Sequence, residues 1–253
     1  MKIAVLIKQI PQLSEVTFGA DGPQWPEGAL IINPFDEYAV EEALRIKERI
    51  GGTAVTISFG KSSAENVLRD TLALGMDEAC LIESDKFSYV DPQMSAQVLA
   101  AAIKKIGDID LVLCGKQASD DDSALVASAV AGYLDWPQVG FVKKFDTIVG
   151  GKLVAWRTTD SGYDVVESSL PAVCSVVKEI NEPRLPSLKG KMKAKKMEIK
   201  KLSPSELGVE MSSPINIKAI DAPKARPQGE MITGETDEII ETLIQKLKAD
   251  QLI

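Results

Sequence analysis

The sequence contains no histidine among its 253 residues. This absence excludes histidine-based triads and histidine-ligated zinc, and it removes the most common general base. A hydrolase or a metalloenzyme is therefore disfavoured, and we predict neither catalytic residues nor metal ligands. The three cysteines, Cys80, Cys114 and Cys174, lie in apolar runs with no short spacing between them. We interpret them as buried thiols, not as a disulfide framework or a metal-binding motif.

Long apolar runs and an excess of positive charge are also missing. No run comes near the roughly 18 apolar residues that span a bilayer. The first residues have one lysine followed by a short apolar run, too short for the apolar region of a signal peptide. We therefore expect the protein inside the cell, in the cytoplasm or, in a eukaryote, in the mitochondrial matrix. The formal net charge of −8 argues against nucleic acid as a partner, because binding phosphates requires a positive field.

The first half of the chain alternates between strand and helix patterns. With 45% hydrophobic and 26% charged residues, the composition is that of an ordinary globular protein with a sizeable core. Strands enclosed by helices imply a parallel, doubly wound sheet of right-handed βαβ units, so the predicted fold class is α/β. The patterns predict strands over 2–10, 53–60, 77–84 and 109–115, and helices over 36–50, 63–75, 91–106 and 121–134.

The pattern changes in the second half. Consecutive strand-like runs over 140–149, 152–159, 163–168 and 171–178 predict an antiparallel extension of the same sheet, with hairpin turns at Gly150-Gly151 and Ser161-Gly162. Residues 181–234 carry six prolines without periodicity, and such a long irregular segment suits an arm that lies on a partner. An amphipathic helix over 235–249 closes the chain. The expected parts are an α/β nucleotide-binding-like domain over 1–180, a docking loop and extended arm over 181–234, and a terminal helix within 235–253.

Residues 114–126, CGKQASDDDSALV, stand at the end of a predicted strand, where parallel sheets bind their ligands. The three aspartates could cap the following helix and interact with its dipole. Alternatively, backbone N–H groups at the helix start could hold a phosphate, provided that the carboxylates point away from it. The chain has no GxxxxGK[ST] and no GxGxxG after its first strand, so these residues alone leave both interpretations open.

Residues 188–201, LKGKMKAKKMEIKK, contain seven lysines in an otherwise acidic protein. A solvated charged segment is the simplest interpretation of such a run. However, Leu185, Leu188 and Met192 are spaced along it and predict one helical turn that presents an apolar anchor within a basic rim. This surface suits a weak and fast partner contact, because charge steers the encounter and the anchor fixes it.

Six stretches of the sequence together carry a family resemblance. They are INPFDEYAVEEALRIKE (32–48), GKQASDDD (115–122), GYLDWPQ (132–138), LPAV (170–173), NEPR (181–184) and MKAKK (192–196). In this order they closely resemble the beta (small) subunit of electron transfer flavoproteins. The resemblance covers nearly the whole chain.

The resemblance implies an electron-carrier subunit on a parallel, adenine-nucleotide-hydrolase-like sheet. It implies a heterodimer with a larger alpha subunit that holds most of an FAD, while the beta subunit supports the flavin domain and buries an AMP without a catalytic role. It further implies that the flavin collects electrons from acyl-CoA or other dehydrogenases. The electrons then pass to a membrane quinone oxidoreductase.

The resemblance also assigns roles to single residues. Leu13 and Phe35 match positions near the edge of the flavin ring, and Asp164 matches a position that reaches towards the moving flavin domain, where the family usually has glutamate. Leu188 matches the anchor of the dehydrogenase-docking loop. The basic stretch that follows the anchor contains Met192, Lys193, Lys195 and Lys196. The positions that match the AMP pocket are Leu6, Asn33, Pro34, Phe35, Asp36, Phe59, Gly115, Gln117, Ser119, Asp120, Asp121, Asp122, Ser123, Ala124, Leu125 and Val126.

At 124–126 the sequence departs from the family pattern. Family members that bind AMP commonly have Asn-Gln-Thr there, whereas this chain has Ala124, Leu125 and Val126. The backbone N–H groups remain, but the side-chain donors are lost. We therefore expect AMP to be held more loosely than is usual in the family, or to be absent.

Two other functions stand beside the electron carrier. In a flavin-bifurcating relative, a second FAD replaces AMP and NADH is oxidised, but that group resembles Asp-Gly-Asp-Thr where this chain has Asp-Asp-Asp-Ser at 120–123. Asp121 should crowd the larger cofactor, since only glycine lets a backbone approach a pyrophosphate so closely. A stand-alone nucleotide-sensing module of the universal-stress type shares the sheet but leaves residues 181–234 without a role.

Overall fold

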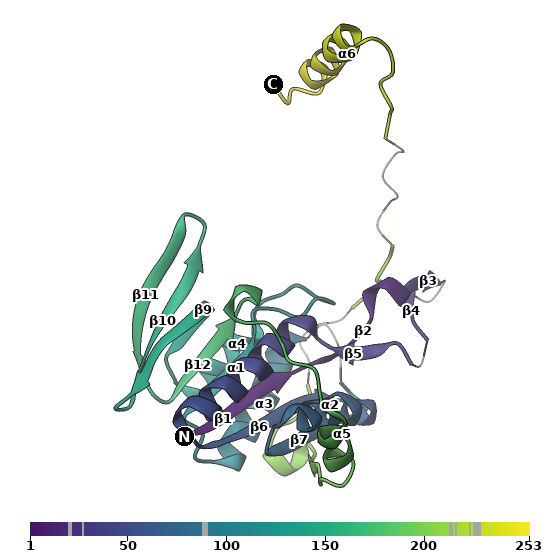
Figure 1. Ribbon diagram of the computed structural model, residues 1–253. Helices are drawn as coiled ribbons and strands as arrows, with labels where there is room; N and C mark the ends of the chain where they lie inside the picture. Colours follow the sequence, from purple (N-terminus) through teal and green to yellow (C-terminus); the bar gives the residue numbers. More distant parts are fainter. Residues whose placement is uncertain are drawn as a thin grey trace.

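The computed structural model describes residues 1–19, 22–26, 28–87, 91–212, 215, 217–222, 224 and 229–253. At its centre lies a nine-stranded sheet (Figure 1). In spatial order the strands are β11 (Gly162–Ser169), β10 (Lys152–Thr159), β9 (Gln138–Val149), β12 (Ala172–Val176), β8 (Leu111–Gly115), β1 (Lys2–Ile7), β6 (Thr53–Gly60), β7 (Glu78–Glu83) and β13 (Lys200–Leu202). The run from β9 to β13 is parallel throughout, which confirms the predicted α/β class.

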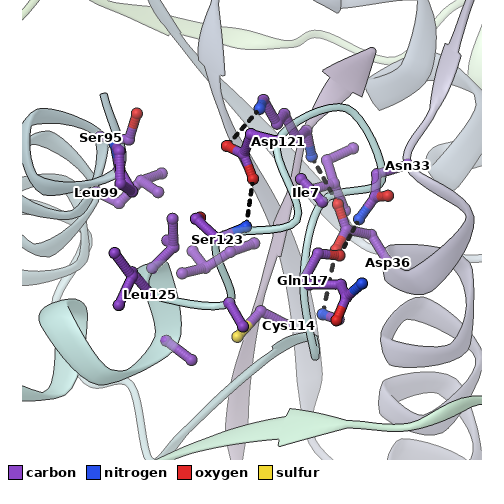
Figure 2. A pocket seen from close by; sticks show the side chains of 18 of the residues that line it. Ile7, Asn33, Asp36, Ser95, Leu99, Cys114, Gln117, Asp121, Ser123 and Leu125 are labelled. Carbon is purple, nitrogen blue, oxygen red and sulfur yellow. Dashed lines mark hydrogen bonds and ion pairs between the residues drawn. The ribbon is translucent and has the colours of Figure 1, made fainter. Parts of the chain in front are cut away.

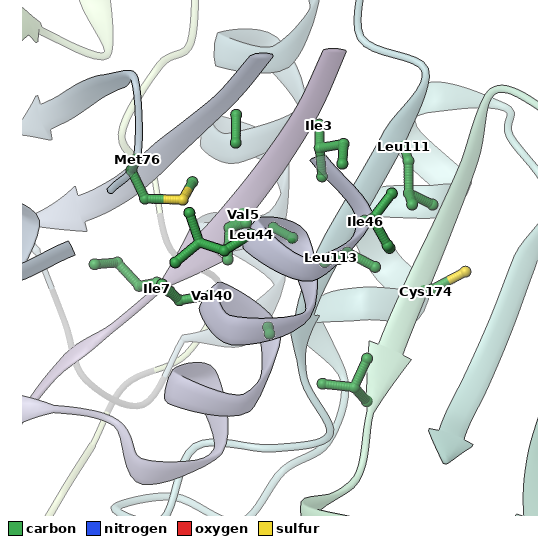
Figure 3. Packing of buried hydrophobic residues seen from close by; sticks show 14 of the residues in the cluster. Ile3, Val5, Ile7, Val40, Leu44, Ile46, Met76, Leu111, Leu113 and Cys174 are labelled. Atoms are coloured by element: carbon green, nitrogen blue, oxygen red, sulfur yellow. The ribbon is translucent and has the colours of Figure 1, made fainter. Parts of the chain in front are cut away.

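Helices cover both faces of the sheet. They are α1 (Pro34–Ile50) and α2 (Glu65–Leu74) on one face, and α3 (Pro92–Ile106) and α4 (Val126–Leu134) on the other. Side chains of β1 alternate between the two hydrophobic clusters. Ile3 and Val5 join the cluster of Leu44 in α1 (Figure 3), whereas Ala4 and Leu6 join the other cluster. Because both faces are buried, the parallel strands have the continuous apolar sequences from which they were predicted.

The antiparallel extension is shorter than predicted. Strands β9, β10 and β11 form antiparallel pairs through two tight turns, as the glycines at 150–151 and 162 indicate. The expectation that residues 171–178 belong to this meander is wrong, because β12 runs parallel to both β8 and β9. Burial explains the difference: every residue of β12 is buried, whereas β11 is mostly exposed at the sheet edge.

The segment expected as an extended arm contains regular structure in its first part. Helix α5 (Leu188–Ala194) packs against α2, and β13 adds a parallel strand beside β7. A 3₁₀ turn, η4 (Ser205–Leu207), follows. The last helix is α6 (Thr236–Ala249), in which no side chain is buried (Figure 1). Part of the arm, including residues 213–214 and 225–228, lies outside the described residues.

The chain also forms two small two-stranded antiparallel sheets, which the sequence patterns did not predict. They are β2 (Gln9–Pro11) with β5 (Leu30–Ile32), and β3 (Thr17–Gly19) with β4 (Gly22–Gln24). The short helical turns are η1 (Leu13–Glu15), η2 (Ser62–Ala64) and η3 (Lys178–Ile180). Within the described part of the chain, no helix has both the length and the apolar character to cross a bilayer.

The three cysteines are buried and unbridged, as predicted. Burial raises the pKa of the Cys80 thiol to about 11 and that of Cys174 to about 12. The pKa of Cys114 is raised still further by the same cause. All three groups are therefore neutral core side chains near pH 7.

Candidate functional site

A pocket opens at the carboxyl ends of β1, β6 and β8, between the start of α1, α3 and the start of α4 (Figure 2). Its lining is mainly apolar with a few convergent polar groups, which is the composition of a site for a small ligand. Its place follows the general rule for parallel sheets, in which the strand ends carry the ligand. We call it the strand-end pocket.

Asp36 ties α1 to the ends of two strands. Its carboxylate accepts hydrogen bonds from the backbone N–H of Lys8 (2.8 Å) and of Gly115 (3.1 Å). A side chain at position 115 would collide with Phe35 and Asp36, so glycine allows α1 to approach β8. Burial has the largest effect on Asp36 and raises its pKa to about 7, although both N–H bonds favour the charged form. The site therefore contains a carboxyl group whose charge changes near neutral pH.

Asn33 holds the loop that follows β8. Its side-chain amide donates to the carbonyl oxygen of Gln117 (2.9 Å), and its Oδ1 accepts from the N–H of Ser119 (3.1 Å). The Gln117 amide in turn donates to the carboxylate of Asp122. One buried asparagine at the start of α1 thus fixes the polar wall of the pocket from a position more than eighty residues away in the sequence.

Lys8 explains how the neighbouring aspartates are tolerated. Its ammonium group lies 2.8 Å from the carboxylate of Asp120 and 3.2 Å from that of Asp121. Asp121 also accepts a hydrogen bond from the N–H of Ser123 (2.9 Å). Burial raises the pKa of Asp120, and the nearby Lys8 charge opposes this shift. The acidic loop is therefore held by the ammonium group of Lys8, which directly follows β1, and by a backbone N–H group of the loop itself.

The aspartates do not cap a helix, which corrects one of the two interpretations. The helix predicted over 121–134 begins at Val126, and its N-cap residue Leu125 makes no side-chain capping bond. Asp122 (φ 51°) and Ala124 (φ 52°) have left-handed backbones, which an α-helix excludes. The carboxylates instead shape the turn that leads from β8 into α4.

The wall opposite the acidic loop is mainly apolar. Phe59 at the end of β6 meets Phe87 edge to face, with 5.1 Å between ring centroids. Leu99 and Ser95 of α3 face Leu125 across the cavity (Figure 2). An apolar slot bordered by hydroxyl, amide and backbone N–H groups can hold a flat ring on one side and hydroxyl or phosphate groups on the other.

Most residues assigned to a nucleotide pocket come together here. Those that line the strand-end pocket are Leu6, Asn33, Asp36, Phe59, Gly115, Gln117, Asp121, Ser123, Ala124, Leu125 and Val126. Five others stand just behind the lining: Pro34, Phe35, Ser119, Asp120 and Asp122. Among the lining residues that reasoning from the sequence did not assign are Lys8, Phe87, Pro92, Ser95 and Leu99. For Lys8 a signal existed, since it directly follows the first strand; the three α3 residues carry no local signal.

The other assigned residues lie outside the strand-end pocket. Leu13 is exposed in η1, and Phe35 lies under the ammonium group of Lys116, 5.0 Å from the ring centroid. Asp164 lies opposite Arg157 in the β10–β11 hairpin. Leu188 is on α5, which lies near the opposite edge of the sheet from the hairpin (Figure 1).

Helix α5 and the segment just before it present an exposed apolar group. Leu185, Leu188 and Met192 are 90%, 78% and 61% exposed. The neighbouring lysines, Lys193, Lys195 and Lys196, are exposed as well. The helix has seven residues, so it is longer than the single turn predicted from the sequence.

The fold and the pocket define an α/β protein with a candidate ligand site at the ends of its parallel strands. Residues 27–207 match the family model of the electron transfer flavoprotein domain. The chain is 39% identical to an electron transfer flavoprotein subunit beta of Thermoanaerobacterium thermosaccharolyticum, with all of both chains covered. It is 38% identical, again over all of both chains, to the caffeyl-CoA reductase-Etf complex subunit CarD of Acetobacterium woodii.

A human relative extends the comparison. The electron transfer flavoprotein subunit beta of Homo sapiens is 37% identical over 220 residues, which cover 86% of this chain and 84% of the human one. The chain therefore belongs to the electron transfer flavoprotein family and matches beta subunits of that family. This confirms the resemblance drawn from the six sequence motifs.

Proposed function

We propose that this chain is the beta subunit of a heterodimeric electron transfer flavoprotein and carries electrons together with an alpha subunit. The observation that supports this most directly is the match to beta subunits over the full chain. The absence of histidine, which removes the most common general base, agrees with a carrier that has no catalytic residues of its own. On this proposal the protein acts in the cytoplasm, or in the mitochondrial matrix of a eukaryote.

FAD, held mainly by the alpha subunit, supplies the redox chemistry. This chain would contribute a supporting surface that includes Leu13 and Phe35. Leu13 is 53% exposed on η1, so about half of this apolar side chain is available to another subunit. Asp164 at the outer hairpin is the proposed contact to the moving flavin domain.

AMP is the proposed occupant of the strand-end pocket, with a structural role. The adenine ring fits the apolar slot beside Phe59 and Leu99, and Ser95 offers a hydroxyl at its edge. The phosphate would meet backbone N–H groups at the start of α4, where Ala124 and Val126 offer no side-chain donor. Loose binding of AMP follows from that lack of donors.

Helix α5 is the proposed docking element for acyl-CoA or other dehydrogenases. Leu188 would enter an apolar pocket of the dehydrogenase, while the exposed lysines meet an acidic rim. Electrons collected in this way would pass to a membrane quinone oxidoreductase. Replacement of Leu188 by alanine should reduce electron transfer from a dehydrogenase and leave flavin content unchanged; an unchanged transfer rate would contradict the docking role.

We also propose that α6 packs on the alpha subunit. Apolar side chains recur along this helix at Ile240, Leu243, Ile244 and Leu247, and none of its residues is buried within this chain. A helix with a free apolar stripe is stabilised by packing, not by propensity alone.

A flavin-bifurcating beta subunit with a second FAD is the alternative function. The similarity to a subunit of the Acetobacterium woodii caffeyl-CoA reductase-Etf complex favours it. Against it, Asp121 lines the pocket and is fixed by Lys8 and the N–H of Ser123. A pyrophosphate in that place would meet a carboxylate, which repels it.

Quantification of the bound nucleotides tests these proposals. The chain is produced together with its alpha subunit, the complex is denatured, and FAD and AMP are measured per heterodimer. One FAD with one AMP, or one FAD alone, supports the electron carrier, and the second result supports the expected loss of the phosphate site. Two FAD per heterodimer would establish the alternative. A folded monomer that binds ATP without flavin would contradict both and favour a nucleotide-sensing module.

A further inference from the structure

The docking helix α5 depends on contacts made by neighbouring elements. With seven residues it is too short to be stable by itself in water. Its inner side packs on α2, and Ala194 is buried in the same cluster as Leu72 and Ala73 of α2. Gly190 allows the close approach, because a Cβ at this position would overlap the carbonyl oxygen of Ala73.

Arg69 of α2 holds the end of this helix. Its Nη1 donates to the carbonyl oxygens of Ala194 (2.7 Å) and Met197 (3.2 Å). Nη2 of the same side chain forms an ion pair with Glu65 (2.7 Å), one helical turn earlier in α2. Carbonyls at a helix end have no partners within the helix, so the guanidinium satisfies groups that α5 and the following turn leave open.

The segment before α5 is attached to α1 in a similar way. Arg184 pairs with Glu41 (2.8 Å) and Glu48 (2.6 Å). Asn181 donates to the carbonyl oxygen of Tyr38 (3.0 Å). The exposed anchor Leu188 therefore stands between two fixed attachment points, one on α1 and one on α2.

We infer that Arg69 and Gly190 are positioning residues for dehydrogenase recognition: they fix α5 in its docking orientation before a partner arrives. The inference rests on the docking role proposed above for Leu188. Neither residue is expected to contact the partner directly. Gly190 faces Ala73, and the guanidinium of Arg69 faces Glu65 and backbone carbonyls. Their contribution is to preorganisation, because a flexible anchor must be ordered at the moment of binding and this ordering weakens affinity.

A kinetic experiment on the complete heterodimer tests the inference. The probe is a short-chain acyl-CoA dehydrogenase reduced by its acyl-CoA, and the rate of flavin reduction is followed at increasing dehydrogenase concentration. Arg69→Ala and Gly190→Ala should each raise KM for the dehydrogenase about five-fold, with kcat within about two-fold of the wild type. Arg69→Lys, which can still donate to one carbonyl, should recover part of the loss.

Two controls separate positioning from docking and from charge. Arg49→Ala removes an exposed arginine from α1 and should leave KM unchanged. Leu188→Ala tests the docking role itself. If Arg69→Ala and Gly190→Ala behave like Arg49→Ala while Leu188→Ala raises KM, the positioning inference is wrong and the docking proposal stands. If Leu188→Ala also leaves KM unchanged, both fail.

Discussion

Ala124 has a backbone conformation that disfavours its own side chain. At φ 52° an L-residue with a Cβ is strained, whereas glycine adopts this conformation freely and asparagine tolerates it. Ala124→Gly should therefore stabilise the folded chain by about 1 kcal/mol. The measurement is the free energy of unfolding in urea for the wild type and the variant. A variant less stable than the wild type would show that the left-handed turn carries no strain.

If AMP occupies the strand-end pocket as proposed, the residue at position 124 should influence how tightly it is held. Ala124→Asn relieves the strain like glycine does and adds a side-chain donor beside the proposed phosphate site. We expect about ten-fold tighter AMP binding for Ala124→Asn than for Ala124→Gly, measured by titration calorimetry on the heterodimer stripped of nucleotide. Equal affinities of the two variants would mean that backbone N–H groups alone hold the ligand.

Asp36 should make stability depend on pH between about 4 and 7. Its pKa is raised from 3.8 to about 7 in the folded chain, so the folded state binds a proton more tightly than the unfolded state. This stabilisation is complete below the unfolded pKa and is lost as pH rises towards the folded pKa. Asp36→Asn cannot titrate, and it also loses one of the two N–H acceptors.

The stability advantage of the wild type over Asp36→Asn should therefore shrink as pH rises from 4 to 7. Urea unfolding of both proteins at several pH values measures this difference, with Asp146→Asn as a control for the loss of an exposed aspartate. A difference that grows with pH would place the folded pKa below the unfolded one. That result would contradict burial as the dominant effect on this group.

At the scale of elements, α6 is an amphipathic helix whose apolar stripe has no cover within the described chain. If it packs on the alpha subunit, a charge on the stripe should weaken the heterodimer strongly. Leu243→Asp is expected to raise the dissociation constant at least about ten-fold, because a buried unpaired carboxylate is costly. Gln245→Asp places the same charge on the polar side as a matched control. Equal dissociation constants, measured by ultracentrifugation, would exclude α6 from the interface.

Sequence patterns predicted the strands that are buried on both faces of the sheet. Strands buried on both faces have continuous apolar sequences, and all four central strands were predicted. The bounds of β6 match the prediction and those of β7 differ by one residue at each end, whereas β8 starts two residues later and β1 ends three residues earlier than predicted. The start of α4 was not predicted correctly, because the left-handed turn at 122–124 contains no glycine to announce it. Strand β13 was missed since three residues with two lysines carry no strand pattern. Only its pairing with β7 makes it a strand.

The candidate site shows the same limit. The loop after β8 was predicted from its position and its family resemblance, but its stabilisation by Lys8 was not. That ion pair joins residues 112 positions apart, and the docking helix is likewise held by Arg69 from a position 125 residues earlier. Local sequence patterns do not indicate contacts between residues so far apart in the chain. These contacts could be identified only from the folded structure.

At the scale of the whole molecule, the candidate surfaces are distributed along the sheet. The outer hairpin with Asp164 lies at one edge, the strand-end pocket near the middle, and α5 beside β7 and β13 at the other edge (Figure 1). On the docking proposal, a dehydrogenase bound at α5 would leave the hairpin and the pocket accessible. Such a separation would suit a carrier that keeps its docked partner while the proposed flavin domain changes its contacts.

The charge distribution has a consequence for association kinetics. The chain carries a net charge of −8, yet seven lysines are concentrated in residues 188–201. If these lysines steer an acidic partner, the association rate with the acyl-CoA dehydrogenase should fall about ten-fold between 20 mM and 200 mM salt, estimated from screening of exposed charges.

Removing part of the basic rim should flatten that salt dependence. Lys195→Gln with Lys196→Gln is expected to lower the association rate at low salt and to leave the rate at high salt nearly unchanged, because screening has already cancelled the attraction there. Lys152→Gln on the distant strand β10 removes an equally exposed charge and serves as the control. Stopped-flow measurements at several salt concentrations give the slopes. If the double variant has the same dependence of association rate on salt as the wild type, these lysines do not steer the partner. Recognition would then depend on the apolar anchor alone.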